Sequence, residues 1–476
     1  MSTLLSETAA GEPHAIFNPA TGQVIGHVKW SSAEEIDSAV QNAHEAFPAW
    51  SSTPVKKRVQ VLYRLKQAIE SNLDKLAKLC SAENGKTPAE ARAGITKGVE
   101  VIEYAASLPQ LVVGGYLEVS EGVTCRTIRE PLGVVAAVTP FNFPVMVPLW
   151  IIPLALGCGN TLVLKPSEHV PLSAIRLREL LIESGLPEGA FQLVHGGREA
   201  VERLIEHPLI KAAGFVGSSR VAQFLYERGT RTGKRILALG GAKNHLLLLP
   251  DADLALSAQN ITDSFTGSTG QRCMAASVLL AVGNVQGIID KIAEMTRGIV
   301  PGRDIGPVIS AEALNKILGY IDQAEADGAT VLVDGRRAKV EGPNEGFWIG
   351  PTILDNVKPE MPAAREEIFG PVLSIIRTPT LKEALAIERG SPYGNAAAVY
   401  TQNGALAKLC AESFNASMIG INIGVPVPRE PFSFGGRNRS RFGYGDITGQ
   451  GAIEFWTQTR KITERWGDYK IAGWIS

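Results

Sequence analysis

The feature that most limits the fold of this chain is a regular alternation of apolar strands and helices between residues 134 and 239. Five short apolar runs have the pattern of strands, and the segments between them have the apolar spacing of helices. Such a repeat forms a parallel sheet with helices on both faces, and sheets of this kind bind ligands at the carboxyl ends of their strands. The predicted strands are residues 134–138, 161–164, 191–194, 212–215 and 235–239.

A second alternating unit follows Gly241, so we expect two α/β units in one chain. Two segments fit neither unit. Residues 119–131 read as an inserted strand pair, and the tail 453–462 reads as a strand with an exposed aromatic pair. The tail either pairs with another subunit or covers a sheet edge within the chain. The strands of the second unit are predicted at residues 246–249, 278–282, 330–333, 373–377, 396–400 and 418–423.

Composition places the chain among ordinary globular proteins. Its 476 residues, of which 45% are hydrophobic and 20% charged, suffice for two or three domains. A net charge of -1 gives no reason to expect nucleic acid or an acidic membrane as partner. The five cysteines lack the spacing of metal sites or disulfides, which suits a reducing compartment. They are Cys80, Cys125, Cys158, Cys273 and Cys410.

The first fourteen residues contain no basic segment followed by an apolar run, so we expect no secretory or transit peptide. The most apolar stretch, residues 144–156, is too short to span a bilayer. We therefore expect a cytoplasmic protein with no membrane partner.

A short stretch, residues 268–275, presents a cysteine in a turn that Gly267 and Gly270 make flexible. Arg272 precedes Cys273, and a nearby cation favours the thiolate, which is the nucleophilic form. A free cysteine is also often a small buried hydrophobe. This stretch alone leaves the two interpretations equally open.

Two candidate sites follow strands of the first unit. Asn142, in Pro140-Phe141-Asn142-Phe143-Pro144, offers an amide that either donates to an oxyanion or bonds within its own turn. Lys165 and Glu168 offer a cation and a carboxylate that either hold the hydroxyls of a ribose or form a surface ion pair.

Two further candidates flank these. In residues 214–219, Ser218 or Ser219 caps a helix whose free N–H groups suit a phosphate, although no G-x-G-x-x-G motif is present. In residues 366–371, Glu367 either binds a second ribose or is an ordinary loop carboxylate.

Together, PFNFP, KPSE, GFVGS, GQRC and EEIFGP resemble the aldehyde dehydrogenase superfamily in order and spacing, along nearly the whole chain. The resemblance implies an α/β fold with a Rossmann-type cofactor domain (1–118 and 136–241) and an α/β catalytic domain (242–440). It also implies a β-strand oligomerisation flap (119–135 and 441–476) that builds a homodimer or homotetramer.

By this resemblance, Cys273 is the catalytic nucleophile, and Asn142 with the Cys273 backbone N–H forms the oxyanion hole. The implied cofactor is NAD, because a glutamate at position 168 is associated with NAD rather than NADP. The cofactor residues implied in this way are Thr139, Pro140, Phe141, Lys165, Glu168, Gly217, Ser218, Gly240, Glu367 and Phe369.

The sequence departs from the main family at Ala238, where most members carry a glutamate as general base. A base contributes about two to four powers of ten in rate, so hydrolysis of an acyl-enzyme should be slow here. Another acyl acceptor is then favoured.

GAKNH, GQRCMA and FWTQTR resemble the methylmalonate-semialdehyde dehydrogenase branch, which uses coenzyme A as the acyl acceptor. In that branch two arginines bind the substrate carboxylate. Arg272 matches one of them, and Lys97 stands where the other is expected, with the charge but without the bidentate fork. The substrate residues implied are Arg272, Lys97, Phe143 and Phe432.

We therefore expect an NAD-dependent, coenzyme A-acylating dehydrogenase of methylmalonate or malonate semialdehyde, with no metal. The alternative is a non-acylating dehydrogenase of a small aldehyde with a carboxylate, phosphonate or sulfonate head. A third hypothesis, motivated by Ala238, is a catalytically silent binding protein. The sequence assigns no role to Lys243 and Asn244, and His245 reads as structural.

Overall fold

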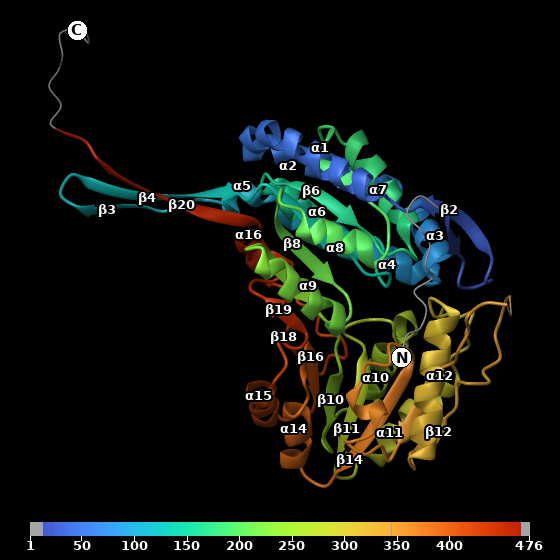
Figure 1. Cartoon of the computed structure of the whole chain (residues 1–476). Helices are drawn as coiled ribbons and strands as arrows, with labels where there is room; N and C mark the ends of the chain where they lie inside the picture. The colour runs from blue at the N-terminus through green and yellow to red at the C-terminus, as the bar shows by residue number, and fades with distance from the viewer. Residues whose placement is uncertain (1–12, 344, 468–476) are drawn as a thin grey trace, which may run out of the picture.

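The structure is a computed structural model that describes residues 13–343 and 345–467. Two large sheets, each covered by helices, form the two halves of the body, and an arm of three strands extends from one half (Figure 1). The predicted α/β class is confirmed.

The first half contains a six-stranded sheet in which every pair of neighbours is parallel except β19 and β9. All five predicted strands are present. From β5 the chain adds β6 and β7 on one side and then β8 and β9 on the other, so the strand order reverses between β5 and β8. In order across the sheet, the strands are β19 (Arg441–Gly443), β9 (Arg235–Leu239), β8 (Ile210–Val216), β5 (Val134–Val138), β6 (Thr161–Lys165) and β7 (Phe191–Leu193).

Both faces of this sheet are buried. Along β5, Val135 and Ala137 face one hydrophobic cluster, whereas Val134, Ala136 and Val138 face another. Continuous apolar strands of this kind are typical of a parallel sheet between two helical layers. The helices of this half are α1 (Ala33–Ser52), α2 (Val55–Ser71), α3 (Leu73–Asn84), α4 (Pro88–Ala106), α5 (Leu108–Leu111), α6 (Met146–Gly157), α7 (Pro171–Glu183), α8 (Arg198–Glu206) and α9 (Ser219–Arg231).

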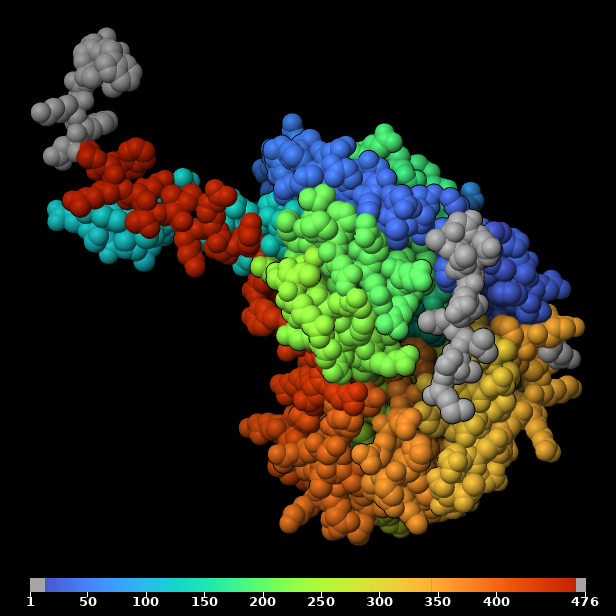
Figure 2. Space-filling view, in the orientation of Figure 1, coloured from blue at the N-terminus to red at the C-terminus, as the bar shows by residue number. Residues whose placement is uncertain are grey.

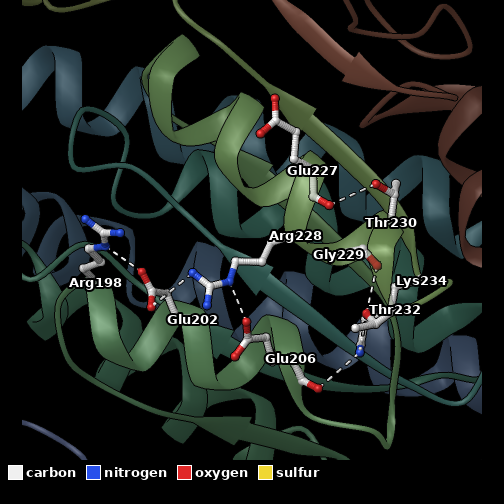
Figure 3. Close-up of polar contacts among 9 residues, drawn as sticks. All are labelled: Arg198, Glu202, Glu206, Glu227, Arg228, Gly229, Thr230, Thr232 and Lys234. Atoms are coloured by element: carbon white, nitrogen blue, oxygen red, sulfur yellow. Dashed lines mark hydrogen bonds and ion pairs between the residues drawn. The ribbon is translucent and has the colours of Figure 1, made fainter.

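On one face, α8 and α9 lie side by side and are joined by surface charges (Figure 3). Arg228 of α9 donates to Glu206 of α8, and its guanidinium lies 3.6 Å from Glu202. The ammonium of Lys234, in the turn after α9, donates to the Glu206 carbonyl at 3.4 Å. Exposed pairs of this kind add less than about 1 kcal/mol each, so the packing of α9 on β9 matters more.

The second half contains a seven-stranded sheet that is parallel except for its edge strand β12. The six predicted strands are present. The sequence analysis did not predict the additional short strand β13, because its few apolar residues do not stand out from the surrounding loop. In order across the sheet, the strands are β12 (Thr330–Val333), β13 (Thr352–Asp355), β14 (Val372–Thr378), β11 (Ala276–Val282), β10 (Asn244–Leu248), β16 (Ala396–Tyr400) and β17 (Met418–Ile421).

Among the described residues, this half also contains six helices, and two small sheets lie outside the large ones. The helices are α10 (Leu254–Thr266), α11 (Gln286–Arg297), α12 (Ala311–Ala326), α13 (Pro362–Arg365), α14 (Leu381–Arg389) and α15 (Gly404–Ser413). Two small sheets pair β1 (Pro13–Phe17) with β2 (Val24–Lys29), and β15 (Tyr393–Gly394) with β18 (Arg437–Asn438).

The arm consists of β3 (Tyr116–Ser120), β4 (Val123–Pro131) and β20 (Thr457–Arg465). The tail strand β20 pairs with β4 of the same chain along its whole length, from Thr457 opposite Pro131 to Arg465 opposite Val123.

The tail differs from the sequence prediction before Thr457. Residues 453–456 belong to helix α16 (Gly449–Trp456), and Trp456 is fully buried against Gly214, rather than exposed on a strand. Residues 441–443 form β19 at the edge of the six-stranded sheet, so within the described part of the predicted flap tail, residues 441–467, β20 is the strand that lies in the arm. Residues 468–476 of that prediction lie outside the described residues.

None of the helices in the described residues combines the length and the apolarity needed to span a bilayer. The same residues hold no group of three or more His, Cys, Asp or Glu side chains placed to bind a metal ion.

Candidate active site

The Cys273 turn lies between the two halves, directly after α10, and its backbone is strained. Ser268, Thr269 and Gly270 have φ values of 50°, 54° and 69°. Left-handed conformations cost a non-glycine residue about 1–3 kcal/mol, so the surroundings must hold them. The Ser268 N–H donates to the Glu90 carboxylate, and a Cβ at position 270 would lie 2.0 Å from the carbonyl oxygen of Gly370. Glycine is therefore required at position 270.

Two asparagines fix the carbonyl group of Cys273. The Nδ2 atoms of Asn244 and Asn395 each donate to this oxygen at 2.8 Å. Asn244 also donates to the Ala275 carbonyl at 2.8 Å and accepts from the Ala396 N–H at 3.1 Å. Asn244 therefore has a structural role in the site that the sequence did not reveal. Asn395 was missed as well, and its only signal was an amide directly before an apolar strand.

The structure brings the predicted oxyanion donor to the same turn. Asn142 follows β5, is buried, and donates its Nδ2 to the Gln271 carbonyl at 3.0 Å. A carboxamide nitrogen carries two hydrogens, so this bond orients the amide and leaves a second N–H for a ligand. The turns after β5 and after α10 are thereby joined at the candidate nucleophile.

The thiol of Cys273 is protonated in this state. Burial, together with the negative charge of Glu367, raises its pKa to about 12, and Arg272 lowers it only in part. Arg272 favours the thiolate of Cys273, as expected of a nearby cation, but in this state desolvation disfavours the anion more strongly than this one cation favours it.

The side chain of Arg272 lies along the end of α10. Its Nη2 donates to the Ser264 carbonyl at 2.8 Å and also to the Asp263 carbonyl. A Cβ on Gly267 would lie 2.4 Å from Nη2, so this glycine makes room for the guanidinium. The Nε atom is buried without a hydrogen-bond partner in the described part of the chain. Part of the guanidinium thus has unused donors beside Cys273.

One side of Cys273 opens into a cavity of about 340 Å³, a size that suits a small ligand. Three of the four predicted substrate residues, Arg272, Lys97 and Phe143, line it. Phe432 does not, and it is 73% exposed at the surface. Phe434 instead reaches the cavity wall, where it packs on Trp150 with ring centres 4.6 Å apart.

The charges in this cavity are mixed. Lys97 donates to the carboxylate of Glu100 on the same helix at 2.7 and 2.8 Å, so its charge is matched before any ligand arrives. Glu90 and Glu430 also line the cavity. Arg429, which sequence analysis missed, lines it as an exposed cation with no side-chain partner in the described residues. The only signal for it was an arginine between two prolines.

The predicted cofactor residues of the first half converge at the carboxyl ends of adjacent strands. Thr139, Pro140 and Phe141 follow β5, whereas Gly217 and Ser218 follow β8. The strand order reverses between these two strands, which is where open α/β sheets bind ligands. Gly240 follows β9 at the same edge.

Lys165 and Glu168 extend this edge beyond β6. The ammonium of Lys165 lies 3.1 Å from Glu168 Oε2. Burial alone would raise the pKa of Glu168, but Lys165, with His169, outweighs it and lowers the pKa to about 2. Glu168 is therefore an anion at any physiological pH.

The second half contributes Glu367 and Phe369 to the same region. Glu367 Oε1 accepts the Ala242 N–H at 2.9 Å, and burial raises the pKa of this carboxyl. Phe369 has a φ of 60°, and its ring lies edge-on to that of Phe141 at 5.7 Å. The two halves thus meet around one edge.

Ala238 is fully buried within β9, where its neighbours are Phe215 of β8 and Phe442 of β19. A methyl group surrounded by apolar strands cannot take a proton, so this position supplies no base.

The family model described as "Aldehyde dehydrogenase family" matches residues 6–462 of this chain. Proteins of Halalkalibacterium halodurans and Pseudomonas aeruginosa, both named malonate-semialdehyde dehydrogenase, are each 43% identical to it. The first match covers 97% of this chain and 96% of the relative, and the second covers 96% and 94%.

Solved structures give the same picture. A methylmalonate-semialdehyde dehydrogenase from Oceanimonas doudoroffii is 39% identical, with a TM-score of 0.95 over 98% of this chain and 97% of that one. A Sinorhizobium meliloti protein assigned as a methylmalonate-semialdehyde dehydrogenase, complexed with NAD, is 40% identical, with a TM-score of 0.95 over 97% and 96%.

The protonated state of Cys273 predicts slow alkylation of the resting protein. At pH 7, iodoacetamide should modify Cys273 about three powers of ten more slowly than free cysteine, and the rate should rise about tenfold per pH unit up to about pH 10. Peptide mass spectrometry in a Cys125→Ser background measures this, since the three remaining cysteines, Cys80, Cys158 and Cys410, are buried. A rate at pH 7 equal to that of free cysteine would contradict the protonated state.

Proposed function

Because the chain belongs to the aldehyde dehydrogenase family, we propose that it oxidises a short semialdehyde with NAD and passes the acyl group to coenzyme A. The names of its relatives support malonate or methylmalonate semialdehyde as the substrate. The single observation that carries the acyl-transfer step is Ala238, because no base stands where a water would need one.

In the first step, the Cys273 sulfur adds to the aldehyde carbon. When a thiol adds to a carbonyl group, the thiol proton moves to the carbonyl oxygen. The reaction of the protonated Cys273 thiol therefore needs no separate base to take up this proton. The second N–H of Asn142 and the Cys273 backbone N–H stabilise the developing negative charge on that oxygen. The carbon then gives up a hydride, which NAD would accept when bound, and the oxygen releases its proton to solvent. A thioester remains on Cys273.

The residues at the shared edge fit NAD, which supplies the hydride acceptor when bound. The anionic carboxylate of Glu168, held by Lys165, suits two ribose hydroxyls and repels an additional phosphate there. Ser218 is the N-cap residue directly before α9, and its hydroxyl makes no capping bond, so the helix N–H groups remain available to a pyrophosphate. We propose that Glu367 and Phe369 border the nicotinamide end.

We propose that Arg272 is the main anchor of the anionic head, because it lines the cavity directly beside Cys273 with unused donors. Arg429 adds a second cation at the cavity wall. Lys97 is a weaker candidate, since a substrate would compete with Glu100 for its ammonium.

The second step transfers the acyl group from Cys273 to the thiol of coenzyme A. Coenzyme A brings its own nucleophile, which is far stronger than water at neutral pH. The absence of a base at position 238 therefore slows hydrolysis of the thioester much more than it slows transfer of the acyl group to a thiol.

We further propose that residues 1–118 and 136–241 form the cofactor domain and that residues 242–440 form the catalytic domain. We also propose that the protein acts in the cytoplasm. Five free cysteines suit a reducing compartment. Cell fractionation with an antibody to the chain tests the location, and recovery of the chain outside the cytoplasmic fraction would overturn it.

The arm supports assembly into a homodimer or homotetramer. It stands clear of the body (Figure 2), and its outer strand β3 exposes Tyr116, Leu117 and Val119 by 71%, 65% and 50%. An unpaired edge strand with apolar side chains is a site for pairing with another chain.

Light scattering should give a mass of two or four times 50.8 kDa for the wild type. Leu117→Glu with Val119→Glu should shift it toward 50.8 kDa, whereas the control Leu256→Glu, an exposed leucine on α10, should not. A monomeric wild type would overturn the assembly.

NADH formation from semialdehydes, with and without coenzyme A, tests the function. With malonate or methylmalonate semialdehyde, steady-state NADH formation should be at least tenfold faster with coenzyme A, and acyl-coenzyme A should be the product. Equal rates in both arms, with free acid as product, would instead support the non-acylating alternative. Cys273→Ala should abolish NADH formation in both arms, and no NADH from any aldehyde with the wild type would favour the silent protein.

A further inference from the structure

A buried lysine with no partner lies beside Cys273. Lys243 is in the link between β9 of the six-stranded sheet and β10 of the seven-stranded sheet. Its side chain is only 3% exposed, and its Nζ atom is buried without a hydrogen bond to any described residue. A buried amine without a hydrogen bond destabilises the folded state, so its retention needs an explanation.

Lys243 lines a second, smaller cavity that Cys273 and Arg272 also line. This cavity has a volume of about 10 Å³, close to the space of one water molecule. Cys273 therefore separates two spaces: the 340 Å³ cavity with Phe143 and Arg429, and the small cavity with Lys243 and Glu367. An acyl group on Cys273 that remains in the larger cavity leaves the smaller one as the side from which an acceptor can attack.

The groups around Lys243 decide its charge. Burial lowers its pKa to about 7, and the carboxylates of Glu367 and Glu366 oppose this only in part. An amine with a pKa near 7 is partly neutral at physiological pH and can accept a proton. The titratable or charged groups that face it are Glu366 and Glu367 before β14, Lys316 on α12, His245 on β10, and Arg272 and Cys273 of the nucleophile turn.

We propose that Lys243 accepts the proton of the thiol that takes the acyl group from Cys273, in place of the carboxylate absent at Ala238. This inference rests on the proposed acyl transfer to coenzyme A. As the acceptor sulfur bonds to the acyl carbon, its proton passes to the Lys243 amine. The bond from the acyl carbon to Cys273 then breaks, and the ammonium returns the proton to the departing sulfur.

The neighbouring groups fit this role less well. Burial lowers the pKa of His245 to about 4, so it is too weak a base, and it lies within the strand β10. Glu367 accepts the Ala242 N–H and lies among the proposed cofactor residues. Lys243 alone among them has a free, buried proton-accepting atom at the cavity.

The test measures two half-reactions of the full-length protein from pH 6 to 9. Rapid mixing with NAD and malonate semialdehyde gives the NADH burst, and subsequent mixing with coenzyme A gives the rate of acyl-coenzyme A release. Lys243→Met removes the base, and Lys243→Arg keeps a cation that does not lose its proton in proteins. Lys234→Met, at a buried lysine beyond α9 (Figure 3), is the matched control.

For the wild type and Lys234→Met, the release rate should rise with pH through a midpoint near 7. For Lys243→Met and Lys243→Arg, it should fall about 100-fold or more at pH 7, and its midpoint should move to a higher pH, toward the pKa of the acceptor thiol itself. The burst amplitude, which also reports correct folding, should be retained in all four proteins.

Several outcomes would overturn the inference. Release by Lys243→Met within threefold of wild type, with the same midpoint, would exclude Lys243 as the base. Normal release by Lys243→Arg would show that only a positive charge is needed. Lost burst amplitude in both variants would assign Lys243 a structural role. A wild-type acyl-enzyme that never reacts with coenzyme A would overturn the proposed function, and the inference with it.

Discussion

The two hydrogen bonds that Asn244 and Asn395 donate to the Cys273 carbonyl are the interaction on which the site depends. They tie the strained nucleophile turn to β10 and to the residue directly before β16 of the second half, while Asn142 ties Gln271 to the first half. Left-handed backbone at Ser268 and Thr269 is unfavourable by itself and persists because its surroundings hold it: the Ser268 N–H donates to the Glu90 carboxylate, and the Thr269 hydroxyl donates to the Gly306 carbonyl. The position of the nucleophile between the two sheets follows from them.

Burial is the second constraint, and it acts on several charges at once. The same desolvation that keeps Cys273 protonated lowers the pKa of Lys243 and raises that of Glu367. Burial therefore favours the uncharged forms of these three side chains, and groups with pKa values shifted in this way can exchange protons during a reaction. The methyl group of Ala238 within β9 removes the usual base, so the remaining proton acceptors lie on the side of Lys243 and Glu367.

Much of this was predictable from the sequence, because apolar periodicity marks buried strands directly. The motif resemblance to aldehyde dehydrogenases is confirmed by the family match and by relatives named semialdehyde dehydrogenases. Effects that depend on three-dimensional surroundings were not predictable. Arg272 adjoins Cys273 in sequence, but its effect on the thiol is outweighed by burial that no local pattern encodes. Phe432 and Phe434 are two residues apart, and only packing on Trp150 decides which one reaches the cavity.

The central claim is that the acyl group waits on Cys273 for a thiol because no carboxylate activates water at position 238. Intact-protein mass spectrometry after a single turnover with NAD and malonate semialdehyde, without coenzyme A, tests it most directly. The account predicts that nearly every chain gains one acyl group on Cys273, that the adduct persists for minutes, and that coenzyme A removes it within seconds. Unmodified Cys273, with free acid accumulating at the rate of NADH formation, would contradict the account.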